Sequence, residues 1–359
     1  MFKKIYEKEN KINSSDKDKD KDISNIFNDM KSLNNLLQKE CKDFYETFEL
    51  LEKINSECGS SAVYRGKLRK NNNSKQIALK FLRTKKKLKE KNQKDFNKHN
   101  EISNHGILKC KHIPALYGYY KIQNSSCIVM EYNQYGDLRN FQRNILKRNK
   151  LSETLISYIA GGILEALNYI HIKNKILHLE IKPQNVLIDE YLNIKLTDFS
   201  TSINYKTLNC INLPMFGTNY YMCPEVLNKR KIIASEASKI DIYSLGVLLY
   251  NLAFDDYPYK VGEVDCKALT QIAKNIKEQK LVFPGNNRLS KAFLDFLKKC
   301  LNKDIKQRYD ISQAMNDAWF RGYQIILDAK EKLDNADKFL IDLMNDNLIQ
   351  FNKYIKTLE

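Results

Sequence analysis

The sequence predicts an α+β fold with a small β-rich N-terminal part and a larger, mainly α-helical C-terminal part. From Leu50 to Leu138 the chain carries short runs typical of strands, interrupted by one basic stretch with helical spacing. From Leu151 onward the apolar period changes to that of a helix, in a stripe formed by Ile156, Ile159, Ile163, Leu164, Leu167 and Ile170. With 359 residues, 43% of them hydrophobic, the chain is long enough to bury a core in both parts.

The elements of the two parts follow from these patterns in chain order. Strands are expected over residues 49–54, 62–68, 76–82, 115–121 and 126–132. Asn71 to Ser74 has the composition of a hairpin turn between the second and third strands. Beyond the first apolar stripe, helices are expected over residues 239–254, 265–279, 290–301 and 311–323.

Three further segments flank these two parts. Residues 1–22 alternate Lys with Asp and Glu, and this charged, low-complexity composition predicts a disordered arm. Residues 23–47 carry apolar positions on one helical face and are expected to form an N-terminal helical extension. Residues 323–359 are expected to form a helical, coiled-coil-like tail, whose apolar seam is interrupted at Asn347. Because this seam would otherwise face water, the tail should either fold back on the larger part or bind a helical partner.

The net charge of +17 raises the question of a nucleic-acid, membrane or acidic partner. In the densest basic run, Arg83 to Lys98, aromatic residues do not alternate with the lysines, so a solvated helix face explains it better than nucleic-acid binding. No apolar run approaches the length of a bilayer span, and the N-terminus lacks the apolar stretch of a secretory signal. A cytoplasmic protein is therefore expected, with the nucleus as the alternative compartment. The eight cysteines are scattered without metal-ligand spacing and predict reduced, structural thiols.

The segment from Leu177 to Ser200 carries the most informative motif. It reads Leu-His-Leu-Glu-Ile-Lys-Pro-Gln-Asn-Val-Leu-Ile-Asp and, seven residues later, Thr-Asp-Phe-Ser. This order closely resembles the catalytic and magnesium-binding segments of eukaryotic protein kinases, and the Lys-Pro that follows the carboxylate resembles their Ser/Thr-specific branch. The resemblance covers residues 48–322. It implies a bilobal protein-kinase-like fold, with an N-lobe over 48–133, a C-lobe over 134–322 and ATP bound between the lobes.

A strand lysine is the first residue to which the resemblance gives a role. The run Ile-Ala-Leu-Lys that ends at Lys80 matches the third strand of the family, where such a lysine neutralises the α- and β-phosphates of ATP. Counting back from the Lys-His-Ile-Pro run that starts at Lys111, the partner carboxylate falls on Glu101. Lys80 and Glu101 are therefore expected to pair. The alternative for Glu101 is an exposed residue on a polar helix.

The resemblance also implies a nucleotide site. Val63 would pack on the adenine, with Met130 as the gatekeeper. The backbone of Glu131 and Asn133 would face the adenine edge. The family has three glycines in its phosphate loop, where this chain has Ser56, Cys58 and Ser61. The loss of these glycines predicts that the loop holds the phosphates less tightly. The full set expected to bind the nucleotide is Gly59, Val63, Ala78, Lys80, Met130, Glu131, Asn133, Asn185 and Asp198.

The implied catalytic groups are Lys80, Glu101 and two residues of the central motif. Glu180 would act as the base, and Lys182 would stabilise the charge of the transferring phosphoryl group. Asn185 and Asp198 supply the oxygen ligands that Mg²⁺ prefers. Three positions depart from the family, which has Arg, the catalytic Asp and Gly where this chain has Leu179, Glu180 and Ser200.

Several other motif residues are implied to be structural. His178 is expected to be a packed, hydrogen-bonded residue, and Asp241 is expected to hold the backbone of the catalytic loop. Glu225 should form a buried ion pair with Arg308. Thr218, in the loop before Glu225, supports the Ser/Thr assignment.

Two functions of different classes follow. The first is an ATP-dependent Ser/Thr protein kinase that transfers the γ-phosphoryl group to protein hydroxyls, at a rate reduced by the longer side chain of Glu180. The alternative is a pseudokinase that serves as a nucleotide-binding scaffold or allosteric partner. The intact lysines, Glu101 and metal ligands favour the enzyme, whereas the substituted base, the glycine-poor loop and Ser200 favour the alternative. The enzyme is the preferred interpretation, with ATP and Mg²⁺ as cofactors and a Ser- or Thr-containing protein as substrate.

Overall fold

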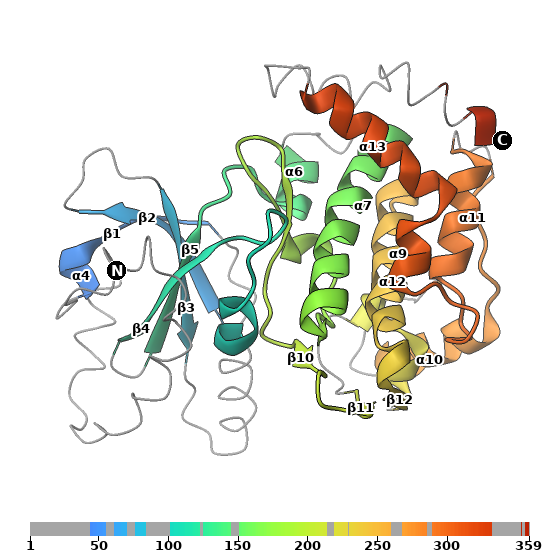
Figure 1. Cartoon of the computed structure of the whole chain (residues 1–359), viewed down its shortest axis with the longest axis horizontal. Coiled ribbons are helices and arrows are strands. Elements are labelled where there is room, and N and C mark those ends of the chain that lie inside the picture. The colour runs from blue at the N-terminus through green and yellow to red at the C-terminus, as the bar shows by residue number, and fades with distance from the viewer. Residues whose placement is uncertain are drawn as a thin grey trace. The chain divides into compact units, whose positions relative to one another are not determined.

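The structure of the protein is a computed structural model, and it describes residues 44–54, 61–69, 76–83, 101–122, 125–144, 151–213, 219–228, 230–259, 268–285, 289–331, 353 and 356–358. The chain divides into two compact units (Figure 1). Unit 1 comprises residues 1–107 and 115–132, and unit 2 comprises residues 108–114 and 133–359. The arm expected over residues 1–22 lies outside the described residues, as does the helical extension expected over 23–47 up to residue 43.

The described strands of unit 1 form an antiparallel five-stranded sheet of order β1-β2-β3-β5-β4. They are β1 (Phe48–Lys53), β2 (Ser61–Leu68), β3 (Ile77–Arg83), β4 (Leu116–Ile122) and β5 (Ser125–Glu131). Each strand begins and ends within one residue of its predicted position. Strand β3 is the central strand of this sheet, which explains its apolar sequence. A strand with neighbours on both sides and with both faces covered has little contact with water.

The two faces of β3 serve different purposes. On one face Leu79 packs with aromatic residues that include Phe44, from the short helix α4 (Phe44–Thr47), and Phe48, whose rings lie 4.8 Å apart. On the other face Ala78 packs with a second apolar cluster. Because successive side chains of a strand alternate between its faces, Lys80 shares the face of Ala78. The aromatic face therefore supports the sheet, and the opposite face carries the lysine singled out by the sequence.

Unit 2 is mainly helical in its described part. Its α-helices are α6 (Leu138–Asn144), α7 (Glu153–Asn168), α8 (Pro224–Leu227), α9 (Ser238–Phe254), α10 (Ala268–Glu278), α11 (Lys291–Cys300), α12 (Ile311–Met315) and α13 (Ala318–Glu331). Helices α7 and α9 are buried along most of their length and form the centre of the core. The single helix expected over 311–323 is wrong, since the chain breaks between α12 and α13. Asp317 causes this break, because its carboxylate accepts the N–H of Trp319 at 2.8 Å and starts a new helix.

One internal helix corrects the expectation about membrane-length segments. Helix α7 continues into a π-helical segment, η1 (Tyr169–Asn174), and the combined 22 residues are long and apolar enough to cross a bilayer. Among the described residues it is the single helix that meets this test. However, 78% of its apolar window is buried inside the protein. The prediction that no apolar run approaches this length was therefore too broad, and the helix is a core helix.

Short strands complete unit 2. The strands β6 (Gly136–Asp137), β8 (Val186–Ile188) and β9 (Ile194–Leu196) form one sheet. Two further pairs are β7 (Ile176–Leu177) with β10 (Ile203–Asn204), and β11 (Cys210–Asn212) with β12 (Lys231–Ile233). Three 3₁₀ turns lie between these elements, namely η2 (Pro183–Asn185), η3 (Asn219–Tyr221) and η4 (Ala234–Glu236). Elements of two or three residues are too short to show a hydrophobic period, which is why the sequence did not predict them.

The turn between β8 and β9 is tightly bonded on both sides. Within it, the Asp189 carboxylate accepts the N–H of Tyr191 at 2.9 Å and of Asn193 at 2.8 Å. Beside β9, His112 donates from Nδ1 to the Ile194 carbonyl at 2.8 Å, and the Leu196 N–H donates to the His112 carbonyl at 2.8 Å. The short hairpin is thus held from within by Asp189 and from outside by His112.

The start of the predicted tail folds back on unit 2. Helix α13 lies beside α7 (Figure 1), and the two meet so closely that a Cβ added at Gly161 would lie 2.2 Å from the Tyr323 ring. Ile326 is fully buried in the same core, and Leu358 packs against it. Folding back, one of the two expectations for the tail, therefore holds for α13. The expectation of a helical partner stays a prediction for residues 332–352, which lie outside the described residues.

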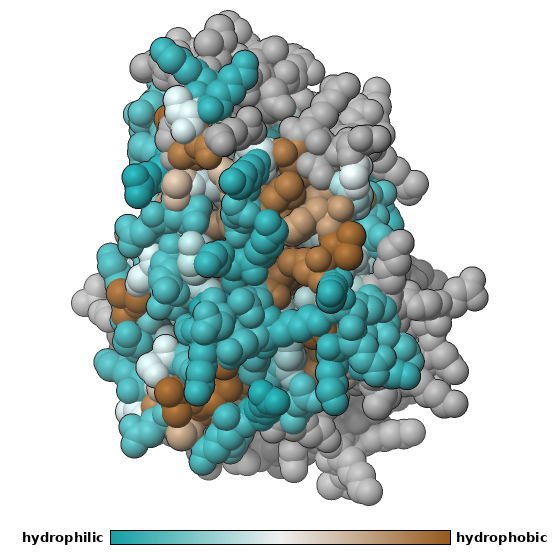
Figure 2. Space-filling model, turned by 90° about the vertical axis from the view of Figure 1, so that its right-hand side faces the viewer, coloured by the Kyte–Doolittle hydropathy of each residue, from teal (hydrophilic) through white to brown (hydrophobic). Residues whose placement is uncertain are grey.

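The surface agrees with the charged composition. Figure 2 shows one face on which hydrophilic side chains dominate and hydrophobic residues gather in a few separate patches. Exposed large hydrophobic residues are scattered along the chain, at Leu51, Ile107, Ile172, Tyr191, Leu208, Ile233 and Val282. Such scattered apolar residues are normal for a protein surface and indicate no binding face by themselves.

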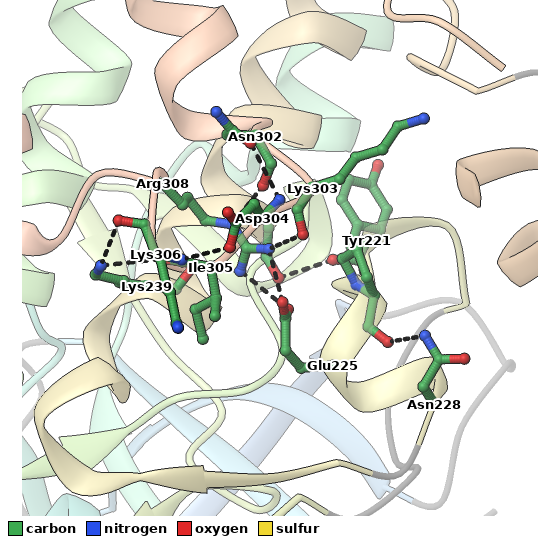
Figure 3. A network of polar contacts seen from close by, with 12 residues as sticks. Tyr221, Glu225, Asn228, Lys239, Asn302, Lys303, Asp304, Ile305, Lys306 and Arg308 are labelled. Carbon is green, nitrogen blue, oxygen red and sulfur yellow. Dashed lines mark hydrogen bonds and ion pairs between the residues drawn. The ribbon is translucent and has the colours of Figure 1, made fainter. Parts of the chain in front are cut away.

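The predicted ion pair between Glu225 and Arg308 is confirmed (Figure 3). The guanidinium reaches both carboxylate oxygens, with Nη1–Oε2 and Nη2–Oε1 distances of 3.0 and 3.1 Å. It also donates to the Asn302 and Lys239 carbonyls at 2.9 and 3.2 Å and lies 4.9 Å from the Tyr243 ring centroid. Both charged groups are buried. Because Glu225 lies in α8 and Arg308 precedes α12, the pair connects these two parts of unit 2.

Replacing Arg308 with Met should destabilise the protein by about 3–5 kcal/mol, because the Glu225 charge would be left buried without its partner. A matched control is Lys298→Met, which removes a cation from the exposed pair with Asp295, whose side chains are 57% and 48% exposed. That change should cost less than about 1 kcal/mol. Urea unfolding of both variants measures the difference, and equal effects would contradict a buried, structural ion pair.

Acid should weaken the hairpin through His112. Burial lowers the pKa of His112 from 6.5 to about 4. Because the folded pKa lies below the unfolded pKa, the neutral ring contributes stability that is present above pH 6.5 and lost as the pH falls through about 4. The free energy of unfolding should drop by about 3 kcal/mol over this window. Urea unfolding at stepped pH should show a shallower slope for His112→Gln, and identical slopes would refute the assignment.

Candidate active site

The predicted pair of Lys80 and Glu101 is formed in unit 1. Lys80 Nζ lies 2.5 Å from Glu101 Oε1, and the side chains are only 8% and 2% exposed. Lys80 stands on β3 opposite Val63 of β2 and Ile128 of β5, while Glu101 lies in a helical segment that the structure describes over residues 101–106. The alternative of an exposed glutamate is therefore wrong. A buried ion pair of this kind fixes the position of the ammonium group on its strand.

Apolar residues surround the lysine on the same face of the sheet. Ala78 and Met130 face each other across β3 and β5 and belong to one buried cluster, against which Val63 packs. All three belong to the set expected to bind the nucleotide, with Val63 on the adenine and Met130 as the gatekeeper, and the structure brings them together. The N–H of Glu131 already donates to the Ala115 carbonyl at 2.9 Å, so this N–H is not an adenine contact.

Of the other two residues expected to contact the nucleotide, the structure describes Asn133 and not Gly59. Asn133, the first residue of the second part of unit 2, is buried, and its carbonyl accepts the N–H of Gly136 at 3.0 Å. Gly59 lies outside the described residues, together with Ser56 and Cys58 of the expected phosphate loop. Their predicted roles stay predictions.

In unit 2, Asp241 holds the catalytic loop as expected. This carboxylate lies in the first turn of α9, is fully buried, and accepts the N–H groups of His178 and Leu179, each at 2.8 Å. It also accepts a bond from His171 Nε2 at 2.8 Å. Burial alone would raise the pKa of Asp241, but the hydrogen bonds from His171 and from the His178 N–H favour the ionised carboxylate and help to hold the pKa below its usual value. The carboxylate is thus an ionised anchor for the loop.

The anchor holds an unusual backbone conformation. Leu179 has a φ of +67°, in the left-handed region that a leucine rarely adopts. Its N–H bond to Asp241 and the packing of its side chain against the core hold it there. A residue strained in this way turns the chain sharply, and here the turn sets the direction of the next residue, Glu180.

The predicted catalytic residues Glu180 and Lys182 are brought together. Lys182 Nζ donates to Glu180 Oε1 at 2.5 Å, and both side chains are mostly buried. Asn185 Nδ2 donates to the Glu180 carbonyl at 2.9 Å. The amide nitrogen of Asn185 therefore bonds to the loop, and its Oδ1 atom is the candidate metal ligand. Oxygen is the atom by which an asparagine binds a hard cation.

The second metal residue, Asp198, follows β9. The N–H of Thr197 donates to the Asn185 carbonyl at 2.9 Å, so the two candidate metal ligands come from directly bonded segments. Asp198 has a φ of +67°, and the N–H of Ser200 lies 3.4 Å from its Oδ1 atom. The donor set of one amide and one carboxylate oxygen suits a divalent cation that takes its other ligands from phosphates and water. Among the described residues, no group of three or more His, Cys, Asp or Glu side chains offers a separate metal site.

His178 links these segments, as expected for a structural residue. Its Nε2 atom donates to the Thr197 carbonyl at 2.9 Å, and its Nδ1 atom accepts the N–H of Glu180 at 3.2 Å. The ring also stands edge-on to Phe199, with centroids 4.9 Å apart. Burial lowers the pKa of His178, which keeps the ring neutral and able to make both bonds.

The comparisons with known proteins identify the family. The protein kinase domain family matches residues 48–320. A MAP kinase kinase of Saccharomyces cerevisiae is 29% identical over 307 residues, which is 83% of this chain and 56% of the relative. The carbon catabolite-derepressing protein kinase of Candida glabrata is 31% identical over 223 residues, which is 62% of this chain and 34% of the relative. A serine/threonine-protein kinase of Eremothecium gossypii is 31% identical over 209 residues, which is 57% and 25% of the two chains.

The chain belongs to the protein kinase family. This confirms the predicted family and its bilobal α+β fold. The relatives named above are themselves protein kinases, and the one from Eremothecium gossypii is a serine/threonine-protein kinase. The family implies ATP and a divalent metal ion. The matched region spans about half of the length of these relatives or less, from 56% down to 25%.

Sequence reasoning missed two residues that support the site. His171 bonds to Asp241, and Thr201 donates from Oγ1 to the His178 carbonyl at 3.2 Å. The position of His171, seven residues before His178 at the end of an apolar stripe, was the available signal. Thr201 carries none, because its role depends on a contact 23 residues away in sequence.

Replacing Asp241 with Asn should release the catalytic loop. The amide keeps the shape of the carboxylate but loses its charge and one acceptor oxygen, so at least one loop N–H would lose its partner. Amide hydrogen exchange at His178 and Leu179 should become about tenfold faster or more, with a lower melting temperature. The control Asp295→Asn, on the exposed face of α11, should change neither. Unchanged exchange in the Asp241 variant would show that other contacts hold the loop.

Proposed function

We propose that the protein is an ATP-dependent Ser/Thr protein kinase that transfers the γ-phosphoryl group of ATP to a Ser or Thr hydroxyl of a protein, with Mg²⁺ as its divalent ion. The observation that carries this proposal is the buried pair of Lys80 and Glu101, with its Nζ–Oε1 distance of 2.5 Å. Burying two charges is costly and brings little stability of its own. A lysine held in this way is well suited to neutralise nucleotide phosphates, which is what phosphoryl transfer requires.

Unit 2 contributes the groups for the chemical step. Glu180 would accept the proton of the acceptor hydroxyl as its oxygen bonds to the γ-phosphorus. The bond from that phosphorus to the bridging oxygen breaks, and ADP leaves with the electron pair. Lys182, already beside Glu180, would stabilise charge on the transferring group. Asn185 and Asp198 would hold Mg²⁺, which supplies charge neutralisation at the phosphates when it is bound.

The rate should be lower than a matching Asp would give. The carboxylate of Glu180 lies one methylene further from the backbone, so the acceptor hydroxyl must shift by about an ångström, at a cost of roughly 10²-fold in rate. The contribution of a general base is itself modest, while positioning and charge stabilisation carry most of the catalysis. Reduced activity is therefore the expected result of this substitution.

A pseudokinase, which binds nucleotide as a scaffold or allosteric partner, is the second candidate. The observation that favours it is the direct contact of Glu180 with Lys182, since a carboxylate engaged by its own lysine is less available to a substrate hydroxyl. Ser61, at a position where a glycine would let the phosphates approach, points the same way. The two candidates differ in one measurable respect, which is transfer as opposed to binding.

The decisive experiment uses the purified full chain with labelled ATP, Mg²⁺ and a generic protein acceptor. Transfer should be measurable in the unaltered chain, and Glu180→Asp should raise it by about 10- to 100-fold, because the shorter side chain restores the base position. Lys80→Met and Asp198→Asn should abolish it. Thermal shift with ATP and Mg²⁺ should show stabilisation of both the unaltered chain and Glu180→Asp to a similar extent.

Each outcome separates the candidates. If neither protein transfers phosphate but both are stabilised by ATP with Mg²⁺, the pseudokinase replaces the enzyme. If millimolar ATP with Mg²⁺ stabilises neither, both nucleotide-dependent functions are wrong.

A further inference from the structure

A lysine of the tail helix reaches into the segment that carries the metal ligands. Lys330 lies in the last turn of α13, ten residues beyond the end of the region that matches the kinase family at residue 320. Its Nζ atom donates to Asn193 Oδ1 and to the Tyr158 hydroxyl, each at 2.8 Å. The ammonium group also lies 5.5 Å from the Tyr158 ring centroid. Both bonds cross more than a hundred residues of sequence, so they are set by tertiary packing alone.

One bond ends on the turn between β8 and β9, and the other reaches this turn through Tyr158 of α7. Asn193 belongs to this turn, and the Tyr158 hydroxyl donates a hydrogen bond to the Leu192 carbonyl at 2.9 Å. Lys330 therefore holds the turn once directly and once through Tyr158. Leu192 has a φ of +59°, a conformation that is unfavourable for a leucine and persists only where its surroundings enforce it. The contacts of Lys330 and Tyr158 provide such enforcement.

The turn sets the spacing of the two candidate metal ligands. Strand β8 begins at Val186, directly after Asn185, and β9 ends at Leu196, two residues before Asp198. Val186 pairs with Leu196 in the register of the two strands. The Thr197 N–H then donates to the Asn185 carbonyl. A change in the conformation of the turn would shift this register and move the Asn185 and Asp198 oxygens relative to each other.

The location of Lys330 is not explained by helix packing. The Tyr323 ring already fits against Gly161 and seats α13 on α7. Burial lowers the pKa of Lys330 to about 8, opposed by the charge of Asp189 at the base of the turn, which also pairs with Lys195 at 3.6 Å. An apolar side chain would avoid this desolvation cost. The hydrogen bonds from the Lys330 ammonium group to Asn193 and Tyr158 offset this cost.

We propose that Lys330 is a positioning residue of the kinase, which holds the β8–β9 turn so that Asn185 and Asp198 keep the separation that a divalent ion requires. This rests on the proposed function, since it assigns the two residues to the metal. It also makes the tail helix part of the active enzyme, although α13 lies mostly outside the region that defines the family.

The test compares Lys330→Met with Arg321→Met in the full chain. Arg321 is an exposed cation on the same helix, so the control makes the same chemical change away from the hairpin. Two readouts need no activity, namely hydrogen exchange of residues 189–193 in the free protein and the Mg²⁺ concentration that gives half of the ATP-induced thermal stabilisation. Lys330→Met should speed exchange about tenfold and raise that Mg²⁺ concentration several-fold. Arg321→Met should change neither, and Lys330→Arg, which can still donate, should restore part of both.

The outcomes separate anchoring from positioning. If Lys330→Met speeds exchange but leaves the Mg²⁺ dependence unchanged, Lys330 is a structural anchor and the positioning role is overturned. If both variants behave alike, the anchoring is overturned as well. An unaltered chain that shows no stabilisation by ATP with Mg²⁺ would instead refute the proposed function, and the positioning role with it, while hydrogen exchange still reports on anchoring. Should Lys330→Met fail to fold, Asn193→Ala removes the acceptor from the hairpin side and must raise the Mg²⁺ requirement in the same way for the proposal to stand.

Discussion

The buried carboxylate of Asp241 is the interaction on which the geometry of unit 2 depends. It stays ionised although it is buried, because two loop N–H groups and His171 supply the hydrogen bonds that water would otherwise give. Its place in the first turn of α9 adds the favourable field of a helix N-terminus. Since α9 is buried along most of its length, this anchor cannot move without disrupting the core. The strained conformation of Leu179, and with it the direction of Glu180, is held by that constraint.

Other buried carboxylates tie the helices of unit 2 together by the same principle. Glu153, at the start of α7, accepts the Ser290 N–H and hydroxyl, each at 2.7 Å, and the Trp319 Nε1–H at 2.8 Å. It thereby joins the N-termini of α7, α11 and α13 through neutral donors. Glu225 uses the guanidinium of Arg308 instead. These connections make the helical part of unit 2 a fixed frame. The short hairpin between the two candidate metal ligands is held in place by side chains that project from this frame, including Tyr158 and Lys330.

How much of this could be read from the sequence depends on the range of the contact. The strands of unit 1 were placed within one residue because each is a short run of residues typical of strands, and the pair of Lys80 with Glu101 followed from motifs that resemble the family. The break at Asp317 was missed, since one capping side chain inside an apolar repeat decided it. The bond from Lys330 to Asn193 spans 137 residues, and the sequence around either residue does not predict it. Long-range polar contacts of this kind follow from packing and appear only in the folded chain.

The three departures from the family differ in their physical consequences. Leu179 replaces a cation with a side chain that packs against the core, so it removes a charge from the loop while strengthening its attachment. Ser200 needs no positive φ, and its N–H approaches Asp198, so the loss of a glycine there is accommodated without strain. Glu180 is different, because its carboxylate is the group that must meet a substrate hydroxyl and it already contacts Lys182. The backbone frame and the two candidate metal ligands are described around it, so among these three departures the length of this side chain is the one that bears most directly on the proposed chemistry.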